Sequence, residues 1–396
     1  MNLTTVITPE LQSLRDAFVA RGFDLRLVGG VVRDLMRGVS PKDIDLCTDA
    51  TPDEQIEIYE ANGFSFHETG LQHGTVTVML NGGPDADGVI RFQTAYEITS
   101  LRTETDHDGR HAVVAYTKDW LADLGRRDLT FNAMALTFDG VLIDPFNGAD
   151  DLANNVVRFV GEADARIQED YLRILRWFRF HARIANNGHM DEATKDSVRR
   201  NGPGLTGISR ERVWMEMSKI VIGNVGAEMV MAMFDTGIHQ FMDLPTGNPW
   251  AIENAVKFGK TKNPVTAMVA MVNGDVGAIT KLAADWKWSA DERDFGIWLA
   301  KAAQANTGDY RRMISHDEVS VGWASELARM KGSAVFADQL LGDTHPVFPV
   351  KGQDLLDAGM KPGKEVGQVL KLLREAWAVN DYTMTKEELV AVAPIS

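Results

Sequence analysis

Cysteine is almost absent from this sequence of 396 residues, which contains only Cys47. One cysteine excludes an internal disulfide and a zinc site built from several cysteines, and it is typical of a reducing compartment. Long apolar runs are absent too, because the longest, VTAMVAMV from Val265, is far shorter than the roughly 20 residues that span a bilayer. The sequence therefore predicts no membrane segment. The first residues resemble neither a signal nor a transit peptide, which predicts the cytoplasm.

The chain also lacks an overall surplus of positive charge. Its formal net charge of −15 argues against a general nucleic-acid coat protein, which normally binds phosphates through excess Lys and Arg. Between Ala165 and Lys219, however, 11 Lys and Arg stand against 7 Asp and Glu, a local balance of +4. This asymmetry predicts one basic surface on an otherwise acidic protein.

The length and patterning predict more than one domain, of class α+β. A chain of 396 residues is too long for one compact core. Up to about residue 146, helices with N-cap signals at Thr8 and Thr51 alternate with short strand patterns, and Asp139-Gly140 indicates a hairpin. After Asp150 helical periodicity dominates. The predicted strands are DLRLVG, DIDLCTD, TVTVML and VIRFQTAYEI.

Two acids one residue apart, Asp43 and Asp45, are the first candidate site. On a strand both side chains would project from one face. Carboxylate oxygens suit Mg²⁺, which in such sites is usually also coordinated by phosphates of the substrate. Two such ions about 4 Å apart could activate an attacking hydroxyl and stabilise the leaving oxygen of a phosphoryl transfer. The alternative is a surface strand with its polar side outward.

A double glycine precedes these acids. Gly29 and Gly30 would let backbone N–H groups approach a triphosphate at the N-terminus of the following helix, and Arg33 would add a charged donor. The alternative is a tight turn without a ligand.

In this order and spacing, the two features resemble motif A of the DNA polymerase β-type nucleotidyltransferases. The resemblance is narrower to the class II tRNA nucleotidyltransferases, which are the CCA-adding enzymes and bacterial poly(A) polymerases. Later segments are similar to the family's third carboxylate strand with its flexible loop, its motifs B and C, its template helix and its following helical motif. These segments are YEITSLRTETDHDGRHA, RRDLTFNAMA, LIDPFNGADDL, EDYLRILRWFRF and GISRERVWMEM.

The resemblance implies an architecture. A polymerase β-like catalytic head with a mixed sheet would occupy residues 1–148, and an all-helical neck with the base-recognition helix residues 149–222. A helical body and tail that bind tRNA would follow over residues 223–396. The resemblance also implies that Glu97 is a third catalytic carboxylate, for which the alternative is a surface acid, and that the loop 99–117 moves when specificity switches from C to A.

Asp170 and Arg173 are candidates for reading a base. Three residues apart on a helix, they would share one face and offer an acceptor beside a donor fork. Cytosine and adenine each present an amine donor beside a ring-nitrogen acceptor and match this pair, whereas uracil and guanine present the reverse. A mismatch leaves buried polar groups unpaired. The resemblance assigns the same role to these two positions.

Five further residues are candidates through the resemblance. Arg127 would contact the nucleotide, while Asp128 and Asn132 would position the ribose 2′-hydroxyl; the alternative is a helix N-terminus with an ordinary capping acid. Arg176 and Arg179 would touch the triphosphate or the base, with a solvated arginine-rich face as the alternative.

Together these features predict a Mg²⁺-dependent enzyme that adds CMP and AMP from CTP and ATP to the 3′ end of tRNA, with no obligate protein partner evident. A bacterial-type poly(A) polymerase is one alternative, although that branch typically has Pro-Val where this chain has Tyr171-Leu172. A CC-only enzyme is disfavoured because the flexible loop is present. A noncatalytic RNA-binding protein on a decayed transferase fold is disfavoured by the retained aspartates.

Overall fold

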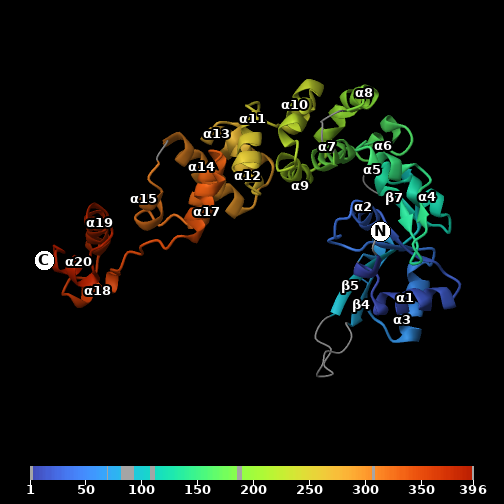
Figure 1. Cartoon of the computed structure of the whole chain (residues 1–396), viewed down its shortest axis with the longest axis horizontal. Coiled ribbons are helices and arrows are strands. Elements are labelled where there is room, and N and C mark those ends of the chain that lie inside the picture. Colours follow the sequence, from blue (N-terminus) through green and yellow to red (C-terminus); the bar gives the residue numbers. More distant parts are fainter. Residues whose placement is uncertain are drawn as a thin grey trace. The chain divides into compact units, whose positions relative to one another are not determined.

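The computed structural model describes residues 3–68, 70–81, 93–107, 112–184, 190–305 and 308–394 (Figure 1). The chain divides into two compact units. The first comprises Met1–Glu216 and Ala232–Met242, and the second comprises Met217–Met231 and Asp243–Ser396. The expected domain boundaries at residues 148 and 222 stay predictions.

Local sequence signals start and stop the first two long helices. Helix α1 (Pro9–Ala20) begins after Thr8, whose hydroxyl accepts a hydrogen bond from the Leu11 N–H at 3.2 Å. Helix α3 (Pro52–Asn62) begins with a capping box, in which Thr51 and Glu54 each bond the other's backbone N–H, and ends at Gly63 with a φ of +70°. Both predicted helices are confirmed.

The first unit contains a seven-stranded mixed sheet. Its spatial order is β3-β4-β5-β2-β1-β8-β9, in which β2 and β5 run parallel and the other neighbours antiparallel. The strands are β1 (Leu25–Val28), β2 (Leu46–Thr48), β3 (Ser65–His67), β4 (Thr75–Asn81), β5 (Gln93–Ser100), β8 (Ala135–Leu136) and β9 (Leu142–Ile143). The α+β class, the mixed sheet and the hairpin at Asp139-Gly140 are confirmed. The start of the VIRFQTAYEI segment lies outside the described residues.

The two faces of this sheet have different partners. Ser100 points to the side covered by α3, where it accepts a 2.8 Å hydrogen bond from the buried Gln55 side chain. Cys47 points to the other side, in a cluster with Leu101 and with Leu124 of helix α4 (Trp120–Gly125). Because side chains alternate along a strand, Asp45 belongs to the Cys47 side.

A two-stranded hairpin, β6 (Arg102–His107) and β7 (Ala112–Tyr116), occupies most of the segment expected to be a flexible loop. Its sequence is rich in Thr and Val, which favour an extended backbone. The segment 99–117 therefore contains two paired strands among its described residues, and its expected motion stays a prediction.

Helices follow the sheet, and no further strand occurs in the part of the chain that the structure describes. None of the described helices is long and apolar enough to cross a membrane. Those after β9 are α5 (Gly148–Ala153), α6 (Ala163–Glu169), α7 (Leu172–Ile184), α8 (Glu192–Asn201), α9 (Arg210–Val221), α10 (Gly226–Thr236), α11 (Trp250–Glu253), α12 (Pro264–Met271), α13 (Val276–Asp285), α14 (Ala290–Ala305), α15 (Tyr310–Ser315), α16 (Val321–Met330), α17 (Ala334–Gly342), α18 (Gly352–Asp357), α19 (Lys364–Val379) and α20 (Lys386–Ala391).

Candidate active site

The segment that leads into β2 carries Asp43 and Asp45. The strand is shorter than predicted, so both acids precede it, although the Asp45 carbonyl still accepts a 3.1 Å hydrogen bond from the Val28 N–H. In the parallel register Leu46 lies opposite Ile98, which places Glu97 beside Asp45 on the same side of the sheet. All three carboxylates are exposed.

The surroundings of Asp45 are electrostatically unfavourable for its negative charge. Its pKa is raised, first because the surrounding protein removes part of its water, and also because Asp43 and Glu97 are negatively charged; Arg127 and Arg33 oppose the shift. A cation bound beside these carboxylates would relieve the repulsion among Asp43, Asp45 and Glu97. No group of three or more acidic, His or Cys side chains at metal-binding spacing occurs among the described residues. An ion at the aspartates would therefore complete its shell with water or substrate oxygen atoms.

The double glycine lies next to Arg127 and Asp45. Gly29 precedes α2 (Gly30–Met36) with a φ of +67°, and a Cβ there would lie 2.8 Å from Nη1 of Arg127. A Cβ on Gly30 would lie 3.8 Å from a carboxylate oxygen of Asp45. At both positions the absence of a side chain leaves room for the candidate residues Arg127 and Asp45, and the predicted approach of a triphosphate to this backbone stays a prediction.

Contacts with Asp123, Cys47 and Asn132 hold the Arg127 guanidinium group in place. This group lies 3.4 Å from the buried Asp123 carboxylate, 3.5 Å from the Cys47 sulfur and 3.5 Å from the Asn132 carbonyl oxygen. Burial raises the pKa of the Cys47 thiol to about 11, so it stays protonated and serves as a small packing residue.

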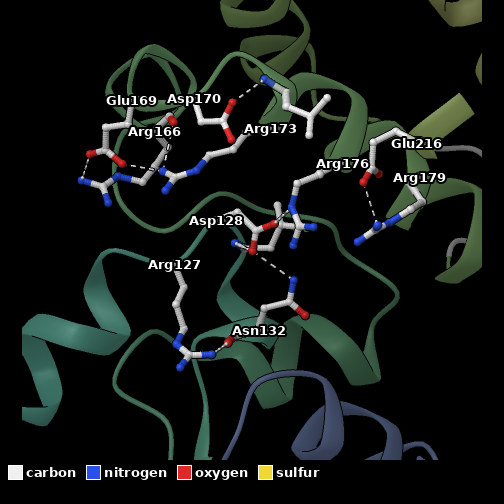
Figure 2. A network of polar contacts seen from close by, with 12 residues as sticks. Arg127, Asp128, Asn132, Arg166, Glu169, Asp170, Arg173, Arg176, Arg179 and Glu216 are labelled. Atoms are coloured by element: carbon white, nitrogen blue, oxygen red, sulfur yellow. Dashed lines mark hydrogen bonds and ion pairs between the residues drawn. The ribbon is translucent and has the colours of Figure 1, made fainter. Parts of the chain in front are cut away.

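A continuous polar network connects Arg33 to helix α7. Arg33 donates to the Asn132 side-chain oxygen at 2.8 Å. The Asn132 amide in turn donates to Asp128 at 3.0 Å (Figure 2). The other carboxylate oxygen of Asp128 accepts from Nε of Arg176 at 2.5 Å. Burial alone would raise the pKa of Asp128, but Arg176 and the hydrogen bonds outweigh burial and lower it. Asp128 is therefore an ionised anchor for Arg176.

Asp170 and Arg173 do not share a helix, which corrects the prediction. Helix α6 ends at Glu169, Asp170 is extended with a φ of −153°, and α7 begins at Leu172. Asp170 accepts from the Leu172 N–H at 3.0 Å, which makes it the first acceptor of α7, and it forms an ion pair with Arg212 at 2.8 Å. The two residues still stand next to each other, at the break between the helices.

Arg173 is held by hydrogen bonds to three acceptors. Its Nη1 donates to Glu169 at 2.5 Å and to the Arg166 carbonyl at 3.0 Å (Figure 2). Its Nη2 donates to the Arg126 carbonyl at 3.0 Å. The bond to Arg126 joins this residue to the segment that carries Arg127. The structure thus links the predicted base-reading residue to the carboxylate end of the site.

Arg179 lies further along α7 than Arg173 and forms an ion pair with a residue that the sequence did not predict. Its guanidinium group donates to the buried Glu216 at 3.0 Å. Burial lowers the pKa of Arg179 to about 10, and nearby Arg176 adds to this shift while Glu216 opposes it. Glu216 gives no local signal in the sequence. Glu169 was also missed, although its position four residues before Arg173 could have indicated it.

Comparisons with known protein families give two matches. The Poly A polymerase head domain matches residues 25–158, and a family described as "Probable RNA and SrmB- binding site of polymerase A" matches residues 189–245.

Two relatives match along most of the chain. CCA tRNA nucleotidyltransferase 1, mitochondrial, from Homo sapiens is 37% identical over 407 residues, covering 98% of this chain and 90% of the relative. A CCA-adding enzyme from Lactobacillus helveticus is 30% identical, covering 93% of this chain and 91% of the relative.

Two solved structures share the fold. The Bacillus stearothermophilus CCA-adding enzyme in complex with CTP matches with a TM-score of 0.73 at 24% identity and covers 97% of both chains. The Thermotoga maritima CCA-adding enzyme in complex with a tRNA matches with a TM-score of 0.63 at 19% identity, covering 97% of this chain and 95% of that one.

Proposed function

Because the chain belongs to the tRNA nucleotidyltransferase and poly(A) polymerase family, we propose that it completes the 3′ end of tRNA by adding CMP and AMP from CTP and ATP. The chain is an enzyme, a nucleotidyltransferase, and the resemblance drawn from its motifs is confirmed. The observation that carries the proposal is 37% identity to a CCA tRNA nucleotidyltransferase across 98% of the chain.

In the proposed reaction, the terminal ribose hydroxyl of the RNA attacks the α-phosphate of the nucleotide, and pyrophosphate leaves. Enzymes of this family generally depend on a metal ion, and we propose Mg²⁺, held by Asp43 and Asp45 with Glu97 beside them. The bound ion would neutralise charge on the phosphate oxygens. The clustered carboxylates and the raised pKa of Asp45 fit a divalent cation with oxygen ligands.

The triphosphate would lie against the glycine backbone at Gly29 and Gly30, within reach of Arg127 and Arg33. These groups supply N–H donors and positive charge without moving, since Arg127 and Arg33 are already held by protein acceptors. Asp128 and Asn132, which bond each other at 3.0 Å, would position the ribose hydroxyl.

Asp170 and Arg173 would read the base. The three hydrogen bonds of Arg173 use three of its five N–H groups, which leaves Nε–H and one Nη2–H without a partner among the described residues. Those donors beside the Asp170 carboxylate match the amine and ring nitrogen of cytosine and adenine. A uracil or guanine edge would set acceptor against acceptor and donor against donor.

The decisive experiment offers each nucleoside triphosphate singly, with Mg²⁺, to tRNA transcripts ending before CCA, at C and at CC, and to an unrelated RNA. We expect C on the first two, A on the third, and no addition beyond CCA. Long A tails on any RNA would indicate the poly(A) polymerase activity that the matching head-domain description names. Normal tRNA binding without incorporation would indicate a noncatalytic RNA-binding protein.

Cytoplasmic localisation stays part of the proposal. The human, mouse and zebrafish relatives carry the word mitochondrial in their names, which describes those proteins.

A further inference from the structure

Phe180 of helix α7 is a buried aromatic ring surrounded by arginines. The guanidinium carbons of Arg179, Arg33 and Arg176 lie 4.6, 5.1 and 5.9 Å from the ring centroid. The ring is 2% exposed and packs edge-to-face against Phe131, with centroids 5.2 Å apart. Three cations from two separate segments of the chain therefore contact one uncharged side chain.

These arginines need compensation for their mutual repulsion. Each has one acidic partner: Asp34 for Arg33, Asp128 for Arg176 and Glu216 for Arg179. A fourth cation, Arg183, shares Asp34 at 3.3 Å, so the cluster keeps a net positive charge. Burial and like charges both act against ionisation of Arg33 and Arg179, whose pKa values are lowered.

An aromatic ring supplies attraction without adding negative charge. The negative face of its quadrupole favours a cation within about 6 Å, and the effect is strongest where water is excluded. A fourth carboxylate would hold the arginines equally well, but it would repel an incoming triphosphate. An aliphatic residue would fill the space and give no electrostatic attraction.

We propose that Phe180 is a positioning residue for nucleotide binding, whose ring face gathers Arg33, Arg176 and Arg179 into one cationic cluster that receives the phosphates of CTP and ATP. This inference rests on the proposed function, because it takes Arg33 as a triphosphate ligand and adds Arg176 and Arg179, which the family resemblance implies at the triphosphate or the base. It predicts that weakening the ring quadrupole raises the KM for both nucleotides, leaves kcat nearly unchanged and leaves the choice between bases unchanged.

A graded substitution tests this role apart from packing. Phe180 is replaced in the full chain by 4-fluoro-, 3,5-difluoro- and 3,4,5-trifluorophenylalanine, which weaken the ring's negative face stepwise with little change in size. The KM for CTP and for ATP should rise in that order, to about tenfold for the trifluoro ring, with kcat within about twofold. Phe180→Leu should show the largest rise in KM.

Phe178 provides the matched control. It lies on the same helix, is fully buried, and packs edge-to-face on Trp177 with centroids 5.0 Å apart. Fluorination there should leave the KM for CTP unchanged. A flat KM series at Phe180, or an equal rise at Phe178, would overturn the positioning role.

Direct binding of CTP, measured by equilibrium dialysis, separates this inference from the proposed function. A dissociation constant for CTP that follows the fluorine series supports the role of Phe180 even if tRNA is not extended. If the unmodified enzyme extends tRNA but the dissociation constant for CTP is the same in all fluorinated Phe180 variants, Phe180 has no positioning role and the proposed function stands. An unmodified enzyme that binds neither CTP nor ATP would overturn both.

Discussion

Arg173 is oriented before any base reaches it, because Glu169 and two main-chain carbonyls hold its guanidinium group. Base choice by such a group depends on its orientation as much as on its presence. The residue that orients it should therefore affect specificity without touching the nucleotide.

Glu169→Gln tests that idea. The amide keeps the shape of Glu169 but removes the charge from its bond to Arg173, so we expect incorporation of UTP relative to CTP to rise about tenfold, or ~1.4 kcal/mol of lost discrimination. Arg173→Ala should relax base choice further than it weakens triphosphate binding. Single-nucleotide incorporation assays on a tRNA ending before CCA measure both. Glu192→Gln, which breaks an exposed pair with Lys195, is the control, and an equal effect there would contradict the assignment.

Asp128 should give the protein a stability that depends on pH. Its pKa in the folded state lies below its ordinary value of 3.8, so the ionised carboxylate stabilises the fold above about pH 4, and this stabilisation is lost as the pH falls toward the folded-state pKa. Asp128→Asn should cost about 1.5–3 kcal/mol at pH 7, because Arg176 loses its charged acceptor.

The difference in melting temperature between the two proteins, measured by calorimetry, should be largest near neutral pH and narrow below about pH 4. Asp196→Asn, which affects an exposed pair with Arg199, serves as the control. A gap between wild type and Asp128→Asn that widens in acid would contradict the ion-pair account.

At the scale of elements, the turn from β1 into α2 matters most to the site, because it brings Gly29 against Arg127. Gly29→Ala adds a Cβ 2.8 Å from Nη1 of Arg127 at a φ of +67°. Because ψ at Gly29 is −117°, this backbone lies outside the regions that residues with a side chain normally adopt, and we expect a loss of about 1–3 kcal/mol in stability. We also expect the KM for CTP to rise at least tenfold, because Arg127 must move.

Gly38→Ala separates these two effects. Gly38 has the same φ of +67°, but no atom lies within 4 Å of its added Cβ. Gly38→Ala should lose about 1 kcal/mol of stability because of its positive φ, and it should keep the wild-type KM. If the two variants raise KM equally, the contact with Arg127 has no role in nucleotide binding.

Elements set by neighbouring residues could be predicted from the sequence. Thr8, Pro9 and Gly22 mark the ends of α1, and Asp139-Gly140 marks a hairpin, because caps and turns depend on local backbone geometry. The break at Asp170 could not be predicted in this way. Its neighbours favour a helix, whereas the break is supported by Arg212 of α9 and by the carbonyl of Arg126, which are distant in the sequence.

In the candidate site, too, local patterns could be predicted from the sequence, whereas contacts between distant segments could not. The aspartates and the double glycine are local patterns, so their chemistry could be predicted, and the structure places Asp45 next to Gly30. The contacts of Phe180 with Arg33 and of Arg179 with Glu216 depend on how distant segments pack. Periodicity gives no measure of such packing.

At the scale of the whole molecule, charge is distributed unevenly. The basic excess between Ala165 and Lys219 includes Arg199 and Arg200 at the end of α8, whose side chains are 41% and 59% exposed, enough to reach an RNA backbone. An acidic chain should therefore bind tRNA at a restricted surface by exchange of counterions.

Replacing both residues, Arg199→Ala with Arg200→Ala, should weaken tRNA binding and make the slope of log affinity against log salt shallower by about 1–2. Filter binding at several salt concentrations measures this slope, and the KM for CTP should not change. Arg21→Ala, which removes an exposed charge paired with Glu57, is the control. An unchanged slope in the double variant would place the tRNA elsewhere.

The parallel pairing of β2 with β5 has a consequence for how the enzyme matures. Parallel neighbours cannot be joined by a tight turn, so a long crossover that includes α3, β3 and β4 must be completed before they meet. Glu97 lies on β5, and Asp45 directly precedes β2. The two residues therefore come together only when β2 pairs with β5, which is a slow, non-local step. We therefore expect Asp45 and Glu97 to come together late in the folding of a newly made chain, so that partly folded molecules lack the complete candidate site.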